Sequence, residues 1–262
     1  KAFSGNFTVT PASGNNHGLV RVANTYHFAY EDGTPYYPIG TTCYVWTHQK
    51  PELQEKTLAT LKKSVFNKFA FVYIHNCISL YDFSKPWVTH CSIQRVDPYK
   101  SAELVSEWRE RYKKPVVLDE ICYEGNIEHG WGNISGQELI RRFWEATCRG
   151  GYAGHGETFL HPEDILWWSH GGELHGESPE RLHFLYQILQ ETPGHGLKQH
   201  YLSWDSVTAV PESPAHQGIY YLDYYGFYRP GFRGFYFDDT TKYHVEVIDT
   251  WNMTITDAGV HQ

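Results

Sequence analysis

Lys114-Pro115-Val116-Val117-Leu118-Asp119-Glu120 is the stretch of the chain that is most informative about the fold. Its apolar run is typical of a strand buried on both faces of a parallel sheet, and it ends in two acids. Side chains alternate along a strand, so Leu118 and Glu120 point to one face and Asp119 to the other. Catalytic side chains of parallel β/α barrels lie at the carboxyl ends of their strands, which makes Glu120 the first candidate for chemistry. The alternative is that one of the two acids caps a loop or pairs with an arginine.

Strands and amphipathic helices alternate on both sides of this stretch. The expected strands lie at 36–42, 69–74, 87–92 and 151–158. The expected helices lie at 51–63, after Ser101, after a Ser135/Glu138 capping box, and from an N-cap at Ser178. After Pro193-Gly194 only strands are expected, at 218–225, 234–238 and 242–251. This order predicts a β-hairpin lead-in at 1–36, a β/α domain with the active site at 37–198 and a shortened β domain at 199–262.

The β/α part contains about five strands, whereas a closed barrel needs eight and usually about 250 residues. The predicted fold class is therefore α/β, an incomplete (β/α) TIM-type barrel of about five strands with a small antiparallel β domain at the C-terminus. An open barrel fragment exposes strand edges and an apolar inner face. We therefore expect a homodimer or a higher homo-oligomer.

The bulk composition narrows the possible partners. The chain has 262 residues and a net charge of −8, without a run of basic residues, so nucleic acid is not expected as a partner. No apolar stretch approaches the length of a membrane span. Aromatic residues make up 16% of the chain, which fits stacking on sugar rings as well as ordinary core packing.

Metals and cofactors are not expected either. The five cysteines form no C-x-x-C pair, which favours buried reduced thiols over a zinc site or a disulfide framework. His90 and His155 lie at expected strand ends, but without a metal-ligand spacing. The location of the protein in the cell stays open, with the cytoplasm slightly favoured.

A second acidic feature is Gly154-His155-Gly156-Glu157-Thr158. Glycosidic bond cleavage uses two carboxyls, about 5 Å apart for retention and about 6.5–9.5 Å apart for inversion. Glu120 and Glu157 end consecutive strands and could meet either condition. The residues expected to bind the sugar lie around these acids: His90, Tyr123, Trp131, His155, Trp167 and Trp168.

Together these motifs resemble a known family. The stretch 114–120 resembles the seventh strand of clan A glycoside hydrolases, the cellulase-like retaining barrels. Gly130-Trp131-Gly132-Asn133, the 154–158 motif and the run from His161 to Trp168 resemble a largely uncharacterised bacterial branch with small flanking β domains. This resemblance implies that Glu120 matches the nucleophile of the family.

The chain also departs from that family. Clan A barrels carry their acid/base in an Asn-Glu pair at the end of the fourth strand, and this sequence contains no Asn-Glu pair. The middle of the barrel is therefore expected to be missing. The first hypothesis is a retaining glycosidase for β-linked plant-type oligo- or polysaccharides, with Glu157 or Glu124 as a substitute acid/base. The second is a carbohydrate-binding relative that has lost its acid.

Overall fold

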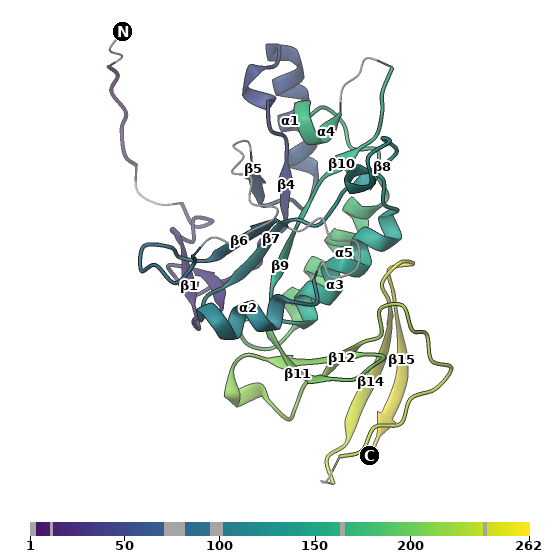
Figure 1. The fold of residues 1–262 in the computed structure, drawn as a ribbon. Coiled ribbons are helices and arrows are strands. Elements are labelled where there is room, and N and C mark those ends of the chain that lie inside the picture. Colours follow the sequence, from purple (N-terminus) through teal and green to yellow (C-terminus); the bar gives the residue numbers. More distant parts are fainter. Residues whose placement is uncertain (1–3, 11–12, 71–81, 95–101, 163–165, 238–239) are drawn as a thin grey trace.

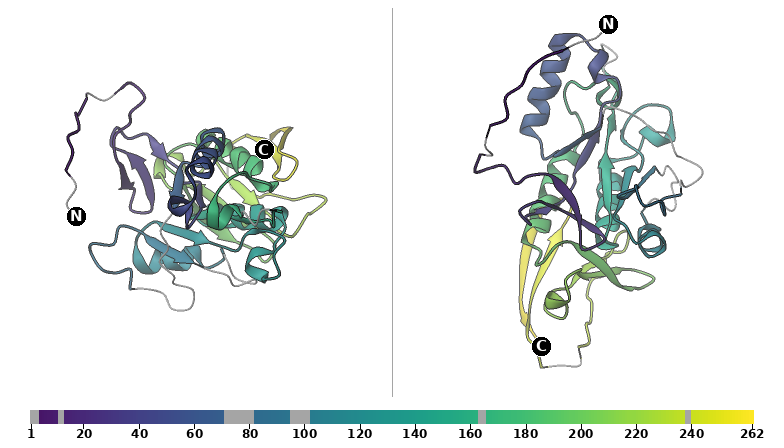
Figure 2. Two further views of the ribbon diagram at one scale, coloured as in Figure 1. Left: turned by 90° about the horizontal axis from the view of Figure 1, so that it is seen from above. Right: turned by 90° about the vertical axis from the view of Figure 1, so that its left-hand side faces the viewer.

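The computed structural model describes residues 4–10, 13–70, 82–94, 102–162, 166–237 and 240–262. A parallel sheet forms its centre, with a small antiparallel sheet before it and antiparallel strands after it (Figures 1 and 2). The fold is thus mixed α/β. Among the described residues, no helix is long and apolar enough to cross a membrane.

The central sheet has five parallel strands in the order β5-β4-β9-β7-β6. Their bounds are β4 Gly40–Thr42, β5 Lys68–Ala70, β6 Cys91–Gln94, β7 Val116–Glu120 and β9 Tyr152–His155. Within the described residues, this count equals the five or so strands expected for the β/α part. β7 and β9 lie in the interior of the sheet, and Val116, Val117 and Leu118 are buried as their apolar run predicts.

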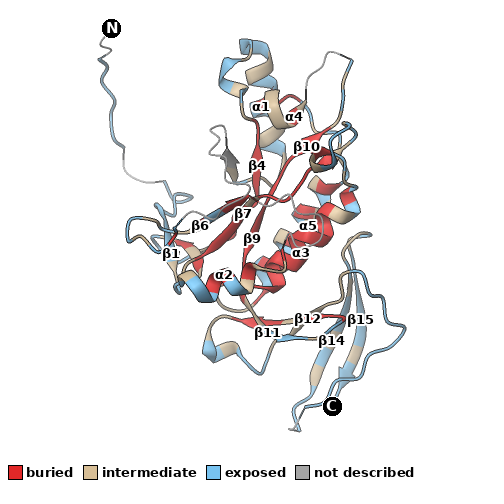
Figure 3. Cartoon of the chain, in the orientation of Figure 1, coloured by how far each residue is buried: buried red, intermediate tan, exposed pale blue. Residues whose placement is uncertain are grey.

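Helices cover one face of the sheet, and the core lies between the two (Figures 1 and 3). The helices are α1 Pro51–Lys63, α2 Val105–Tyr112, α3 Gly136–Cys148, the short α4 Trp167–His170 and α5 Ser178–Glu191. The bounds predicted for α1 are confirmed, and the Ser135 side chain caps α3 by accepting from the Glu138 backbone N–H. The predicted cap of α5 is wrong, because Ser178 is the first helical residue and its hydroxyl donates to Glu124. Ser101 lies outside the described residues.

Antiparallel strands flank this core. The N-terminal sheet consists of β1 Val20–Ala23, β2 His27–Tyr30 and β3 Pro35–Tyr36. The C-terminal strands are β11 Leu197–Leu202, β12 Val207–Pro211 and β13 Leu222–Tyr224 in one sheet, and β14 Tyr243–Asp249 with β15 Thr254–His261 in a hairpin. Two-residue strands β8 Glu124–Gly125 and β10 Glu157–Thr158 pair with each other in parallel.

Four predicted strands differ from the structure. Residues 87–90 precede β6 instead of belonging to it, and Trp87 is 70% exposed. Of the strand predicted at 69–74, residues 69–70 belong to β5 and the rest lies outside the described residues. Residues 234–237 form no strand, and the predicted strand at 218–225 is reduced to β13. At 87–90 and 234–237 the aromatic and β-branched residues favour a strand locally, but no neighbouring strand pairs with them there.

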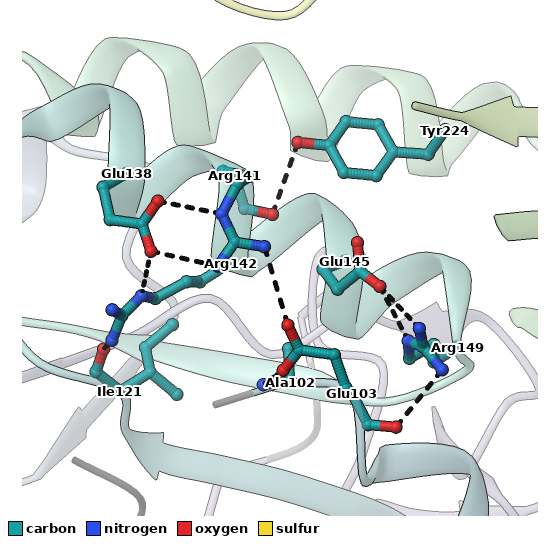
Figure 4. Close-up of polar contacts among 9 residues, drawn as sticks. All are labelled: Ala102, Glu103, Ile121, Glu138, Arg141, Arg142, Glu145, Arg149 and Tyr224. Atoms are coloured by element: carbon teal, nitrogen blue, oxygen red, sulfur yellow. Dashed lines mark hydrogen bonds and ion pairs between the residues drawn. The ribbon is translucent and has the colours of Figure 1, made fainter. Parts of the chain in front are cut away.

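The buried helix α3 joins the parallel sheet to the C-terminal strands. It packs against α5 and β9 and also against the sheet of β11, β12 and β13, so its polar face cannot point to water. Arg141, Arg142 and Arg149 are therefore buried, each in an ion pair with Glu138 or Glu145 (Figure 4). Buried charges need such partners, which explains the i,i+3 and i,i+4 spacings of acid and arginine along this helix.

Candidate active site

Glu120 ends β7 in the interior of the parallel sheet. The residue is 7% exposed, and its Oε1 atom is buried without a hydrogen-bond partner among the described residues. Burial raises the pKa of this carboxyl to about 7, although a hydrogen bond from Tyr123 acts in the opposite direction. A buried polar atom with no partner is unusual in a native structure and marks a place where a ligand atom or water can bind.

A tyrosine hydroxyl lies beside this carboxyl. Tyr123 is 1% exposed, and burial together with the nearby Glu120 raises its pKa well above the usual range, so the phenol keeps its proton. It can then donate to the carboxylate. The Tyr44 hydroxyl lies 3.2 Å from the Tyr123 hydroxyl. Tyr44 was not foreseen from the sequence, because it follows the short strand β4 without any motif around it.

Half-buried tryptophans form a wall next to these hydroxyls. The Trp131 ring meets the Tyr123 ring edge to face at 6.0 Å, and its centroid lies 5.1 Å from that of Trp168. Trp168 in turn meets Tyr44 edge to face at 5.8 Å. The loop carrying Trp131 is held here because the Tyr123 backbone N–H donates to the Trp131 carbonyl. The structure thus brings together Glu120, Tyr123, Trp131 and Trp168.

Trp167 and His155 are buried too completely to form a surface on which a sugar could stack. Trp167 is 2% exposed, and its indole N–H donates to the Thr41 hydroxyl, which lies 3.0 Å from His155 Nδ1. His155 is fully buried against Phe66, and desolvation lowers its pKa to about 3, so the ring is neutral. Its Nε2 atom has no partner within the described ranges. Together with Glu120 Oε1, this makes two buried atoms at carboxyl ends of the parallel strands that lack a partner among the described residues.

Both carboxylate oxygens of Glu157 accept hydrogen bonds from the backbone that precedes α5. Glu157 is fully buried and accepts the backbone N–H groups of His175 and Gly176 at 2.5 and 2.8 Å. Burial raises its pKa to about 7 despite these bonds. Glu124, its neighbour in the β8–β10 pair, accepts the next two backbone N–H groups, from Glu177 and Ser178. Both candidate acids therefore act as anchors for the N-terminus of α5, where negative charge is favourable.

His90 lies at the other end of the sheet. It directly precedes β6, whose first residue Cys91 is level with Val116 at the start of β7. Parallel strands place His90 at the amino ends, a strand length away from Glu120. Its ring packs edge to face against Phe28. The structure therefore does not bring His90 to the cluster, because β6 begins later than the sequence pattern indicated.

A buried arginine supports the loop after Glu120. Arg142 is 2% exposed and donates to the Ile121 carbonyl at 2.6 Å and to Glu138 at 2.7 Å (Figure 4). Cys122, which follows Ile121, has a φ of 70°, an uncommon value for a residue other than glycine. Arg142 thus holds in place the backbone that carries both Glu120 and Tyr123.

A separate charged pair lies beside the end of β7. Asp119 accepts from Lys68 at 2.6 Å and from Ser92, and the β6–β7 register is irregular between Leu118 and Glu120, so the strict alternation expected along β7 is interrupted at Asp119. A small cavity between Thr42, Lys68 and Asp119 adjoins this pair. Across the described ranges, no group of three His, Cys, Asp or Glu side chains is placed to hold a metal ion.

Comparison with known proteins gives a fold and one family match. A family model described as a domain of unknown function, DUF5605, matches residues 204–262. No curated protein sequence matches the chain. The structure is similar to the crystal structure of a "putative glycoside hydrolase" from Bacteroides vulgatus ATCC 8482, with a TM-score of 0.82 and 23% identity over 98% of this chain and 78% of that chain. The chain therefore has a glycoside hydrolase-like fold.

Proposed function

We propose that this protein is a retaining glycoside hydrolase for β-linked oligo- or polysaccharides, with Glu120 as its nucleophile. The observation that carries the proposal is a buried carboxylate with an unpartnered oxygen at the carboxyl end of an interior parallel strand. Tyr123 donates to it, and the half-buried Trp131 ring packs against Tyr123 and against Trp168. In the reaction a Glu120 oxygen would attack the anomeric carbon and displace the leaving group, and water would then cleave the glycosyl ester.

The strand order supports a barrel origin of the sheet. From β6 the strands run β7, β9, β4, β5, so the last parallel strand of the chain pairs with the first. That pairing is what closes a β/α barrel, and a barrel opened between its second strand and a later one would give this order. We infer that the sheet is part of a clan A-type barrel whose middle strands are missing. The division at residues 1–36, 37–198 and 199–262 belongs to the same proposal.

The identity of the proton donor decides between two functions, a hydrolase and a carbohydrate-binding protein. Glu157 remains the candidate that ends the strand region after Glu120, and a pKa of about 7 suits a general acid. Its two backbone hydrogen bonds, however, favour a role as a helix anchor. The same is true of Glu124. This observation favours the second candidate function, a carbohydrate-binding relative that keeps the aromatic wall and has lost its acid.

Hydrolysis of aryl glycosides by the wild type and by Glu120→Gln tests the proposal. The variant keeps the shape of the side chain and removes the attacking charge, so turnover of a reactive glycoside is expected to fall by at least about 10³-fold. Glu55→Gln, an exposed change on α1, serves as the matched control and is expected to be neutral. Equal turnover of Glu120→Gln and the wild type would refute the nucleophile assignment.

The dependence of turnover on the leaving group, and the effect of azide on turnover, distinguish the two candidate functions. If Glu157 is the acid, Glu157→Gln should greatly slow the hydrolysis of substrates with poor leaving groups. It should leave the hydrolysis of dinitrophenyl glycosides unchanged, because their leaving group departs without a proton. If the chain lacks an acid/base, the wild type itself should cleave only dinitrophenyl glycosides, and azide should accelerate it by attacking the glycosyl ester in place of water. A wild type that cleaves no substrate but binds sugar would identify the binding relative.

A further inference from the structure

A tight turn at the tip of the β11–β12 hairpin presents one tryptophan to solvent. The Ser203 backbone N–H donates to the Ser206 carbonyl, and the Ser203 hydroxyl donates to Asp205. These two bonds fix the turn, and Trp204 within it is 80% exposed. An exposed indole offers a flat apolar face on which a ligand can stack.

A second ring stands beside this indole. The centroid of Tyr228 lies 5.1 Å from that of Trp204, and the two planes meet at 79°. Tyr228 is held by its backbone N–H, which donates to the Tyr225 carbonyl. The two rings therefore form the sides of a corner that can hold one flat apolar face and still leave its edges accessible.

Polar groups lie at the base of the same corner. Asp205 is 7% exposed and pairs with Arg233 at 3.0 Å, which ties the loop after β13 to the hairpin. Asp223, on β13, accepts from Thr208. The Tyr225 hydroxyl is buried, and no partner for it exists in the part of the chain that the structure describes. A carboxylate, a guanidinium and an unpartnered phenol next to exposed rings are what hydroxyl-rich, flat ligands require.

We propose that the corner formed by Trp204, Tyr228 and the Asp205–Arg233 pair binds a pyranose unit of a β-linked polysaccharide. It is a second site, since the C-terminal strands lie across α3 and α5 from the parallel sheet (Figure 1). Trp204 stacks on the apolar face of the sugar, and the ion pair takes the hydroxyls at its rim. The choice of a β-linked polysaccharide rests on the proposed hydrolase function, because a second site on the same polymer would hold the enzyme to its substrate.

The segment that follows the corner carries further exposed rings. All exposed large apolar side chains of residues 226–237 are aromatic: Phe227, Tyr228, Phe232, Phe235, Tyr236 and Phe237. Phe232 and Tyr236 are 91% and 97% exposed. Rings spaced along this segment offer successive platforms for successive sugar units.

Affinity electrophoresis in gels containing hydroxyethyl cellulose, xylan, galactan or mixed-linkage β-glucan tests the site. The parent protein is Glu120→Gln, so hydrolysis cannot interfere and the result does not depend on catalysis. We expect at least one polymer to retard it, and the added change Trp204→Ala to weaken that retardation at least tenfold. Trp87→Ala is the matched control, because Trp87 is 70% exposed on a different part of the chain, and it should keep full retardation.

Three outcomes would overturn the proposal. The first is that no polymer retards Glu120→Gln. The second is that Trp204→Ala and Trp87→Ala weaken retardation equally. The third is that Trp204→Ala leaves retardation unchanged but lowers the mass in light scattering, which would make the corner an interface between copies of the chain. Failure of the proposed hydrolase function alone would leave the retardation of the parent and its loss in Trp204→Ala intact.

Discussion

The buried carboxyl of Glu120 makes the stability of the protein depend on pH. Its pKa is raised from 4.5 to about 7, so between these values the folded state holds a proton that the unfolded state releases. The stability that this group contributes is complete below about pH 4.5 and is lost as pH rises through 7. The lost part amounts to roughly 3 kcal/mol at most, from 1.36 kcal/mol for each pKa unit.

Glu120→Gln should therefore stabilise the protein in a pH-dependent way. We expect its melting temperature to exceed that of the wild type at pH 8 and to approach it at pH 4. Differential scanning calorimetry at both values measures this, with Glu55→Gln as the exposed control. Glu157, whose pKa is also raised to about 7, should leave part of the pH dependence in place. The same difference at pH 4 and pH 8 would contradict the burial argument.

Arg142 should matter beyond its charge. Arg142→Lys keeps the positive charge but cannot bond both the Ile121 carbonyl and Glu138 with a planar fork. We expect a loss of roughly 1–3 kcal/mol in urea unfolding, because a buried carbonyl or carboxylate is left without its partner. If Arg142 also positions Glu120, the pH dependence of stability should shrink, because a displaced carboxyl is better solvated. Arg111→Lys, an exposed change on α2, should alter neither quantity.

At the scale of elements, the N-terminus of α5 depends on two carboxylates from the β8–β10 pair. Gly176 lies between them, and a Cβ added there would overlap carboxylate oxygens of both Glu124 and Glu157. Gly176→Ala should therefore push these carboxylates off the backbone N–H groups and lower the melting temperature by several degrees. Gly130→Ala is the control, because a Cβ at Gly130 meets no atom within 4 Å. Equal melting temperatures for the two variants would mean that the loop before α5 adapts freely.

The elements with strong local signals could be predicted from the sequence, and the others depended on long-range contacts. α1 and β7 follow from a proline start and an apolar run, and the cap of α3 follows from Ser135 and Glu138. The start of β6 was misplaced, because nothing local reveals that Trp87 is exposed. Strands β11 and β12 were missed, since their pairing with each other and with β13 is what defines them.

In the candidate site, too, residues with a local sequence signal could be predicted, and those placed by long-range contacts could not. Glu120, Tyr123, Trp131 and Trp168 could be named because they follow a strand end or lie in an aromatic motif. Tyr44 comes near them through long-range pairing, because β4 pairs with β9 and the Tyr44 backbone N–H donates to the Trp168 carbonyl. The backbone partners of Glu157 lie 18 and 19 residues further along the chain. A sequence pattern predicts an acid at a strand end, but it does not predict what that acid contacts.

For the whole molecule, a buried network joins parts that are far apart in the chain. His27 on β2 contacts the Tyr152 hydroxyl at 2.7 Å and Glu212 at 3.1 Å, and Glu212 also pairs with Arg109 on α2. The N-terminal sheet, the parallel sheet and the C-terminal strands therefore meet at one ion-paired cluster. Desolvation lowers the pKa of His27 in spite of Glu212, so protonation in acid would oppose this packing.

The last prediction concerns association. β5 and β6 are the two outer strands of the described parallel sheet, and Ser92 and Asp119 on the face opposite the helices are partly open to solvent. Unpaired strand edges next to such a face favour contact with another chain. A second copy could extend the sheet by the same contact on both subunits. We therefore expect light scattering at low micromolar concentration to give at least twice the chain mass of 30.4 kDa.

Ser92→Lys would add charge at the β6 edge and should shift the population towards monomer, whereas Glu55→Lys, at an exposed position of α1, should not. A monomer in the wild type would mean that the edges are covered within one chain.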